Sequence, residues 1–388
     1  MQVFENATPA VGSWEMRRHL GPLAKELFIA CRPDRMEEDI VSQTNSVYAA
    51  LFNAIQQEGG STEHVLHETV FFRNIRRDLE LSRKTSAQAM NSLSGNAFYA
   101  PASTLIQQAP VDQSFAIELL AYVLIPEAGP EVTREITSPL QQTGRVFLLG
   151  GRKHVLLANI CGLPGNSEEE AYSMFQAAGT LLKTENLSFR DVARTWIHLR
   201  NIDCDYGGLN SGRTRFFREQ GLGLPPASTG IGGAPPIQTR TMCLSLYAIE
   251  QTEAVAQPMS TPTLNEAWLY GADFSRGMKI EGPNGITLFI SGTASVDERG
   301  RTVHRGDFEA QVERMILNIS TLLEKQESSW SDVVSAITYL KNPADAPSLD
   351  NILTRKGIRG FPNVLVHAPV CRPDLLCEME AIAKFPLS

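Results

Sequence analysis

Residues Ile286–Asp297, ITLFISGTASVD, followed by Asp307–Gln326, DFEAQVERMILNISTLLEKQ, decide the fold because the chain presents the same two patterns three times. The first is a run of apolar and β-branched residues that predicts a strand. The second has apolar residues at the spacing of an amphipathic helix. The same pair occurs at residues 26–57 and again at residues 145–185. A repeated unit of this length sets the architecture of the whole chain.

Each repeat continues in the same order after its helix. A linker with a serine that we expect to cap a turn leads into a strand, a second helix, a proline and two closing strands. The serines are 127 and 141 residues apart, and the prolines are 125 and 136 residues apart. These markers are Ser61, Ser188 and Ser329, and Pro101, Pro226 and Pro362. Two independent markers therefore give nearly the same period.

The repeats predict an α+β fold built from three modules, each with two helices on one face of a sheet. Three such sheets would bury their open faces against each other in a pseudo-threefold, barrel-like core. The clefts left between modules are favoured places for a ligand. The expected boundaries are a leader at 1–22, modules at 23–126, 142–250 and 265–388, and connectors at 126–141 and 250–264.

Composition limits the function. The 388 residues are 43% hydrophobic and carry a net charge of -8 without a long basic block, so we expect no nucleic-acid partner. The longest apolar run is too short to span a bilayer, and the start of the chain lacks an apolar signal region, which favours the cytoplasm. His64 and His67 lack a third ligand, so we expect no metal site. No glycine-rich phosphate loop precedes a helix, and we expect no organic cofactor.

The stretch His367–Ala383, HAPVCRPDLLCEMEAIA, carries the candidate chemistry. Its alternation predicts a strand on which Glu378 and Glu380 share one face. A carboxyl group on a rigid strand, beside a turn that carries Cys371 and Arg372, could be a proton donor next to an anion clamp. The alternative is a solvated sheet face on which Glu380 and Arg372 form a surface pair.

The repeat unit resembles the reactive-intermediate deaminase (YjgF-like) module. Three such modules in one chain, with the strings PASTGIGG, SGTAS and VCRPDLLCE, are similar to the chorismatase family. That resemblance implies cleavage of the enolpyruvyl ether of chorismate to pyruvate and to 3-hydroxybenzoate, 4-hydroxybenzoate or a dihydrodiol acid. A deaminase would hold its substrate carboxylate with an arginine after the closing proline. Here the corresponding residues are Ser103, Ser228 and Asn363, which favours the chorismatase resemblance.

The resemblance also implies roles for residues. Glu378 matches the catalytic glutamate that would protonate the methylene carbon, and Glu380 could raise its pKa by repulsion between like charges. Arg372 and Arg213 would clamp the two carboxylates of chorismate. The remaining candidates are Tyr206 and Asn210, which share a helix face with Arg213, and Arg276 as a third cation.

Product choice depends on fewer residues. Thr229 and Gly232 lie in a glycine-rich segment whose backbone could approach a planar ring. Cys371 resembles the residue of members that make 3-hydroxybenzoate, in which the ring hydroxyl attacks internally, while Ala294 leaves hydrolysis open. Glu118 stands in the first closing strand without a nearby Arg or Cys in sequence, and we interpret it as structural. The second Cys-Arg-Pro-Asp string, Cys31–Asp34, is interpreted as coincidence.

The sequence therefore predicts a pyruvate-releasing chorismatase that needs no cofactor and acts as a monomeric pseudo-trimer on chorismate. Two alternatives stay open. One is a YjgF-like enamine or imine deaminase, and the other is a catalytically silent pseudo-trimer that binds a small anion or a protein partner.

Overall fold

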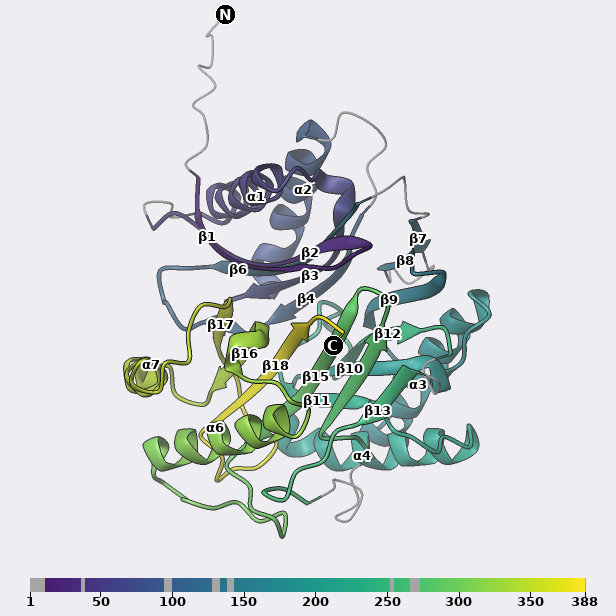
Figure 1. Ribbon diagram of the computed structural model, residues 1–388, viewed down its shortest axis with the longest axis vertical. Coiled ribbons are helices and arrows are strands. Elements are labelled where there is room, and N and C mark those ends of the chain that lie inside the picture. The colour runs from purple at the N-terminus through teal and green to yellow at the C-terminus, as the bar shows by residue number, and fades with distance from the viewer. Residues whose placement is uncertain are drawn as a thin grey trace, which may run out of the picture.

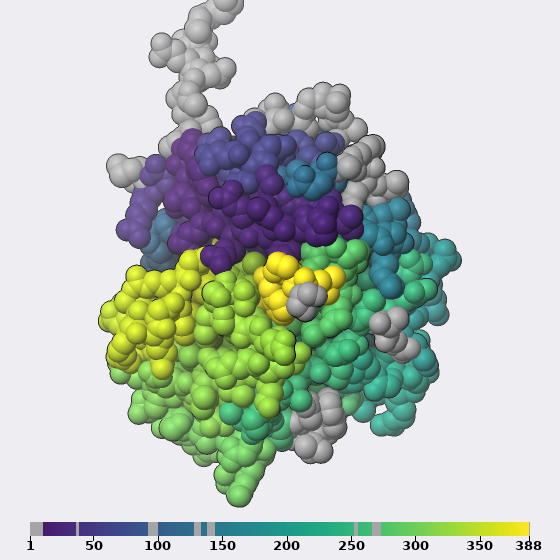
Figure 2. Space-filling model, viewed as in Figure 1, coloured from purple at the N-terminus to yellow at the C-terminus, as the bar shows by residue number. Residues whose placement is uncertain are grey.

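The computed structural model describes residues 11–35, 39–93, 100–127, 133–137, 143–251, 255–265 and 273–387. In these ranges the helices lie on the outside and the strands lie between them (Figure 1). Figure 2 shows the purple N-terminal part of the chain seated directly on the green and yellow C-terminal part. No helix in the described ranges combines the length and the apolar character that a membrane span requires.

The first module is a five-stranded sheet with two helices. Its strands run in the order β1-β2-β6-β3-β4, and β4 is parallel to its neighbour β3. The elements are β1 (Ser13–Leu20), β2 (Ala24–Arg32), α1 (Ile40–Gln57), β3 (Val65–Phe72), α2 (Ile75–Leu93), β4 (Ala102–Gln107), β5 (Ala109–Pro110) and β6 (Ile117–Pro126).

The second module repeats this order as β8-β9-β12-β10-β11, with one added edge strand, β7. The elements are β7 (Arg134–Thr137), β8 (Thr143–Leu149), β9 (Arg152–Ile160), α3 (Ser167–Thr184), β10 (Val192–Leu199), α4 (Ile202–Glu219), β11 (Ala227–Gly232) and β12 (Met242–Ile249).

The third module has the order β14-β15-β18-β16-β17, with β13 added at one edge. The elements are β13 (Ala256–Pro258), β14 (Gly277–Gly282), β15 (Gly285–Ala294), α6 (Phe308–Glu324), β16 (Val333–Leu340), α7 (Ala346–Arg355), β17 (Asn363–His367) and β18 (Cys377–Phe385). The predicted α+β fold with three modules of one topology is confirmed.

The repeat markers have the expected local roles. Ser188 and Ser329 each cap a short 3-10 turn, and their hydroxyls accept a hydrogen bond from a backbone N–H inside the turn. In both turns an aspartate, Asp191 or Asp332, accepts a hydrogen bond from the backbone N–H of the serine, which completes a capping box. Ser61 starts the equivalent turn in the first module. Each of these turns leads directly into the next strand of its module, which is β3, β10 or β16.

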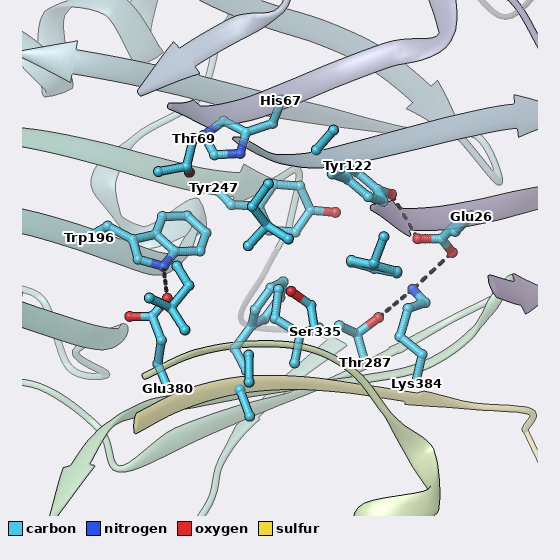
Figure 3. A pocket seen from close by; sticks show the side chains of 18 of the residues that line it. Glu26, His67, Thr69, Tyr122, Trp196, Tyr247, Thr287, Ser335, Glu380 and Lys384 are labelled. Carbon is cyan, nitrogen blue, oxygen red and sulfur yellow. Dashed lines mark hydrogen bonds and ion pairs between the residues drawn. The ribbon is translucent and has the colours of Figure 1, made fainter. Parts of the chain in front are cut away.

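The open faces of the three sheets meet at a central cavity of about 90 Å³. Side chains from each module line it, among them Tyr122 of β6, Trp196 of β10 and Glu380 of β18 (Figure 3). The edges of the sheets also meet. An isolated bridge joins the first module to the second, another joins the second to the third, and β5 of the first module pairs with β17 of the third. The contacts therefore run round the molecule in a closed ring.

The expected leader and connectors need correction. Residues Ser13–Leu20 form β1, which pairs with β2 along its whole length, so this part of the leader belongs to the first sheet. The connectors at 126–141 and 250–264 contain the edge strands β7 and β13. β1 is an edge strand whose side chains are mostly exposed or half-buried, so it lacks the apolar alternation that marks a buried strand. The other module boundaries stay predictions.

Candidate functional site

A cavity of about 270 Å³ lies at the junction of the second and third modules. The second module contributes residues of α4 and β11, and the third contributes β15, the start of β18 and the turn before it. The lining residues include eight of the ten predicted site residues: Tyr206, Asn210, Arg213, Arg276, Ala294, Cys371, Arg372 and Glu378. The structure therefore brings together side chains that are up to 172 positions apart in sequence, from Tyr206 to Glu378.

Glu378 is the buried acid of this cavity. It pairs with Ala294 of β15 and Tyr339 of β16, and only 4% of its surface is exposed. No hydrogen bond to its carboxyl group is found in the part of the chain that the structure describes. Burial raises the pKa of Glu378 to about 8; the charge of Glu380 raises it further, and Arg194, Arg276 and Arg372 oppose the rise. Glu378 therefore carries a proton at neutral pH and points it into the cavity.

Gly292 lies against the Glu378 carboxyl group and was not anticipated from sequence. The register of β15 against β18 shifts between Ile290 and Thr293, which brings the Gly292 backbone under the acid. A Cβ at this position would collide with Oε1 of Glu378 and would lie 3.0 Å from Cγ2 of Thr229. A side chain at this position would have to displace the Glu378 carboxyl group, and the one sequence signal of Gly292 is its place in the string SGTAS.

For a reaction that uses the proton of Glu378, we expect Gly292→Ala to lower kcat by about 10²-fold, because the new methyl group displaces the acid by about 1 Å. Steady-state kinetics on the folded variant measure this. The matched control is Gly282→Ala in the neighbouring strand β14, where a Cβ meets only ordinary contact at 3.8 Å. Equal activity of Gly292→Ala and the parent protein would contradict this placement of Glu378.

Three arginines give the cavity a positive charge. Arg213 is 3% exposed and donates to Oδ1 of Asn210 at 2.7 Å. Arg276 is 5% exposed and donates to the backbone oxygen of Asn265 at 2.8 Å. Arg372 donates to the backbone oxygen of Gly300 at 2.7 Å. Glu378 is the only carboxyl side chain among the described lining residues, so a chain of net charge -8 presents a locally cationic pocket.

Helix α4 presents three of the predicted residues from one face. Tyr206, Asn210 and Arg213 follow each other at steps of four and three residues and all line the cavity. Two glycines on another face, Gly208 and Gly212, have no room for a Cβ because α3 packs against them. This close approach of α3 fixes the position of α4, and with it the direction of the three side chains.

Cys371 is a neutral thiol in this site. Burial raises its pKa to about 12, and the charge of Glu378 raises it as well. Its side chain is hydrogen-bonded to Tyr206. The thiol is therefore not a nucleophile at neutral pH, and it forms a weakly polar wall beside the acid.

Two predicted residues do not line the cavity. Ser228 and Gly230 of β11 line the cavity, and because successive side chains of a strand point to opposite faces, Thr229 faces away from it. Its Oγ1 accepts hydrogen bonds from Arg194 Nη2 and Gly292 N. Gly232 ends β11 and is covered by Pro369, whose oxygen accepts its N–H at 2.9 Å. Neither residue lines this cavity, and their approach to a ligand stays a prediction.

In their place, Ser228 and Gly230 supply the β11 part of the lining.

The solvated interpretation of Glu380 is wrong. Glu380 is 6% exposed, and its carboxylate accepts hydrogen bonds from Arg194 at 3.0 Å, Trp196 at 2.7 Å and Tyr339 at 3.1 Å. Arg372 donates to Gly300 instead of pairing with Glu380 on a surface. The three donors lie on β10 and β16, and a sequence pattern within β18 gives no sign of them.

The first module has a related cleft with different chemistry. By strand register Glu118 takes the place of Glu378, because it pairs with Phe71 as Glu378 pairs with Tyr339. Contrary to expectation an arginine is close, since Arg32 Nε donates to Glu118 at 3.0 Å. Burial raises the pKa of Glu118 to about 7, and Arg32 opposes the rise. Residue 32 belongs to the Cys31–Asp34 string that we interpreted as coincidence.

This cleft of about 1120 Å³ does not reproduce the cationic pocket. Arg32 is neutralised by Glu118 and Glu15, and Arg35 pairs with Asp112. In the second module the equivalent of Glu378 is Cys243, which pairs with His198. Among the three closing strands, only β18 combines a carboxyl group at this position with a pocket of positive charge.

The two histidines singled out in sequence have structural surroundings. His64 accepts the backbone N–H of Ser61 in the first 3-10 turn, and burial lowers its pKa. His67 lies 3.1 Å from Oγ1 of Thr104, and burial lowers its pKa to about 4. Within the described ranges no three His, Cys, Asp or Glu side chains are placed to hold a metal ion.

Comparison with known proteins adds three findings. The family model described as Endoribonuclease L-PSP matches residues 270–385. A RutC family protein of Pyrococcus abyssi is 31% identical over 111 residues, which are 28% of this chain and 84% of that protein. A chorismatase of Streptomyces rapamycinicus is 24% identical over 223 residues, which are 50% of this chain and 65% of that protein.

A crystal structure of chorismatase superimposes with a TM-score of 0.62 at 18% identity, and it covers 83% of this chain and 93% of that one. At this identity the match concerns the fold. The sequence match to the Streptomyces chorismatase supports the family resemblance independently of the fold. This chain spans slightly less than two thirds of the length of that protein.

Proposed function

We propose, from the premise that the chain belongs to the RutC family and has the chorismatase fold, that the cavity between the second and third modules is a chorismatase-type active site. One observation carries the proposal. A buried carboxyl group with a pKa of about 8 and no hydrogen bond in the described structure faces a pocket with three arginines. Such a pocket suits a substrate that carries negative charge and needs a proton.

Chorismate has both properties. Its two carboxylates would bind to Arg213, Arg276 and Arg372, because a guanidinium group matches a carboxylate with two parallel hydrogen bonds. Glu378 would give its proton to the methylene carbon of the enolpyruvyl group. The ether carbon then becomes an oxocarbenium ion, which the new carboxylate of Glu378 stabilises.

On the internal route the ring hydroxyl oxygen attacks the ring carbon that bears the ether, the bond between that carbon and the ether oxygen breaks, and pyruvate leaves with that oxygen. The hydroxyl proton returns to the carboxylate of Glu378. The epoxide that forms opens with loss of the hydrogen on the attacked carbon, which makes the ring aromatic. The products, 3-hydroxybenzoate and pyruvate, together contain the atoms of chorismate and need no water. If water adds to the oxocarbenium carbon instead, the bond between that carbon and the ether oxygen breaks, the oxygen stays on the ring, and the products are a dihydrodiol acid and pyruvate.

The Cys371 wall favours the internal route, because a thiol holds water poorly and the ring hydroxyl is already joined to the reacting group.

The experiment is to incubate purified protein with chorismate, to follow pyruvate with lactate dehydrogenase and NADH, and to identify the ring product by NMR. We expect pyruvate and 3-hydroxybenzoate in equal amounts. A non-aromatic diol in place of the hydroxybenzoate would overturn the argument from Cys371 and keep the enzyme class. No pyruvate from chorismate would overturn the proposed function.

The deaminase alternative is tested with the same protein. The test substrate is 2-aminoacrylate, an enamine that is generated in situ. A deaminase would convert it to pyruvate and ammonia. Ser103, Ser228 and Asn363 stand where a deaminase would place its arginine, so we expect no acceleration of ammonia release. Ammonia from the enamine together with inertness toward chorismate would favour the deaminase.

The pH dependence follows from the raised pKa of Glu378. The acid form is present below a pH of about 8, so kcat is expected to be level at neutral pH and to fall as the pH rises through about 8. A profile of kcat against pH at saturating substrate measures this. A rise of kcat through the same range would mean that the charged form of Glu378 is the active one.

A further inference from the structure

Directly beneath Glu378, the second and third modules are joined by a buried ionic cluster. Arg194 of β10 donates from Nη2 to Glu380 of β18 at 3.0 Å, and the side chains are 2% and 8% exposed. Trp196 donates its indole N–H to the other carboxylate oxygen at 2.7 Å, and Figure 3 shows this bond at the wall of the central cavity. The hydroxyl of Tyr339 completes the cluster.

The Arg194 guanidinium is held on three sides. Its Nη2 also donates to Oγ1 of Thr229 at 2.6 Å, and the group lies 4.9 Å from the centre of the Trp196 ring. Thr229 in turn accepts the N–H of Gly292, the glycine under the Glu378 carboxyl group. One continuous set of contacts therefore links Arg194 to the floor of the candidate site.

The position of this cluster is specific to one junction. Strand register shows which residues are equivalent in the other modules. Glu380 pairs with Ile337, and at the same level of the sheet Leu120 pairs with Thr69 in the first module and Ser245 pairs with Trp196 in the second. Neither equivalent carries a charge. The charged residue at this level therefore occurs only in the closing strand that also carries Glu378.

A second buried ion pair joins two modules at a distance from the candidate site. Lys384, near the other end of β18, lies 2.8 Å from Glu26 of the first module (Figure 3). It joins two modules but does not border the candidate site. Burying charges costs free energy that apolar packing would not. The Glu26–Lys384 pair shows that a buried ion pair can join two modules away from the candidate site. What suggests a further role for Glu380 is therefore its position two residues from Glu378.

We propose that Arg194, Trp196 and Tyr339 are positioning residues that hold the carboxylate of Glu380 in place next to Glu378, and that this fixed negative charge keeps the proton on Glu378 until substrate takes it. The inference rests on the proposed function. The three donors fix the position of this carboxylate, and a negative charge on the same strand face disfavours ionisation of the neighbouring acid.

The charged groups that act on Glu378 oppose one another. Glu380 raises the pKa of Glu378 more than Arg194 lowers it, and Arg276 and Arg372 lower it from the pocket side. The Cys371 thiol and the Tyr339 hydroxyl are neutral at working pH because burial raises the pKa of each. Removing only the charge of Glu380 takes away an influence that raises the pKa of Glu378 and leaves the opposing influence of Arg194 in place, so the pKa of Glu378 falls.

The test is Glu380→Gln, with kcat measured against pH. We expect the alkaline limb of the profile to move to lower pH by about one to two units, with activity recovering toward the parent value in acid. A purely structural role would lower kcat equally at every pH. An unmoved limb, or a uniform loss, would overturn the inference.

Controls separate charge from packing. Glu26→Gln makes the same change in the other buried ion pair and is expected to lower the melting temperature without moving the limb. Tyr339→Phe removes one neutral donor and no charge, so it should move the limb less than Glu380→Gln does. If Glu380→Gln does not fold, the double variant Arg194→Met/Glu380→Leu replaces the pair by apolar residues, and the limb should still move to lower pH.

A readout independent of turnover distinguishes the two possible failures. The infrared C=O stretch that is lost in Glu378→Gln reports the proton on Glu378 directly. If the parent protein releases no pyruvate, the proposed function fails, and the infrared titration still tests the inference. If the stretch disappears at the same pH in Glu380→Gln as in the parent, the inference fails while the proposed function stands.

Discussion

Glu378→Gln is expected to lower kcat for chorismate by about 10²–10⁴-fold, the range typical of losing a general acid, and to leave the affinity for 3-hydroxybenzoate nearly unchanged. Glutamine keeps the shape of the buried side chain but has no proton to give to carbon. The loss therefore falls on the chemical step. Stopped-flow release of pyruvate and titration with 3-hydroxybenzoate measure the two quantities.

Glu118→Gln is the matched control, because Glu118 occupies the equivalent register position in the first closing strand and is 4% exposed like Glu378. It is ion-paired with Arg32 in a cleft where Arg35 is also paired with a carboxylate, and its replacement should leave kcat within about twofold. Its expected effect is a loss of stability, since Arg32 would lose a buried partner. Comparable losses of kcat in both variants would contradict the assignment of a single active cleft.

Arg213→Gln is expected to raise KM for chorismate by about 10- to 100-fold with a smaller change in kcat. A hydrogen bond to a charged group contributes about 1.5–3 kcal/mol, and each 1.4 kcal/mol is a factor of ten in affinity. Arg213 is buried beside Phe274 in the cavity, so water cannot replace its charge on a bound carboxylate. Michaelis–Menten kinetics at neutral pH measure the effect.

Arg215→Gln serves as its control on the same helix. Arg215 lies over Tyr172 and pairs with Glu219 on the exposed side of α4, away from the cavity. Its replacement should leave KM unchanged. If Arg213→Gln behaved like Arg215→Gln, the carboxylates of the substrate would have to be bound elsewhere, by Arg276 and Arg372 alone.

The features that could be predicted from sequence are those with a local cause. The repeats follow from hydrophobic period and capping serines, which act within a few residues. Tyr206, Asn210 and Arg213 could be grouped because helical geometry alone puts them on one face. The likeness of Glu378 and its turn to a known family completed the list, and the structure places eight of ten such residues in one cavity.

The features that could not be predicted depend on contacts between modules or on register. Glu380 looks like a solvated strand residue until Arg194 and Trp196 of another module are placed against it. Thr229 belongs to the glycine-rich segment that we expect near a ring, and the sequence does not show which side of β11 its side chain faces. The signal that existed was the arginine within the strand VARTWIHL, because a charge in a strand of otherwise buried residues needs a partner.

The same reasoning explains the first module. Arg32 and Glu118 are 86 positions apart and meet because β2 and β6 are neighbours in the sheet. Because the two residues are far apart in sequence, their ion pair could not be predicted. That pair is one reason why this cleft differs in charge from the candidate site.

The most direct test of the central claim, that Glu378 protonates the methylene carbon, is to run the reaction in D₂O and to reduce the pyruvate to lactate as it forms. The carboxyl proton of Glu378 exchanges with solvent before substrate binds, so the account predicts one deuterium in the methyl group of the lactate. A concerted transfer of hydrogen from the ring to the methylene carbon would give the same pyruvate without a solvent proton. Lactate with an unlabelled methyl group would contradict the account.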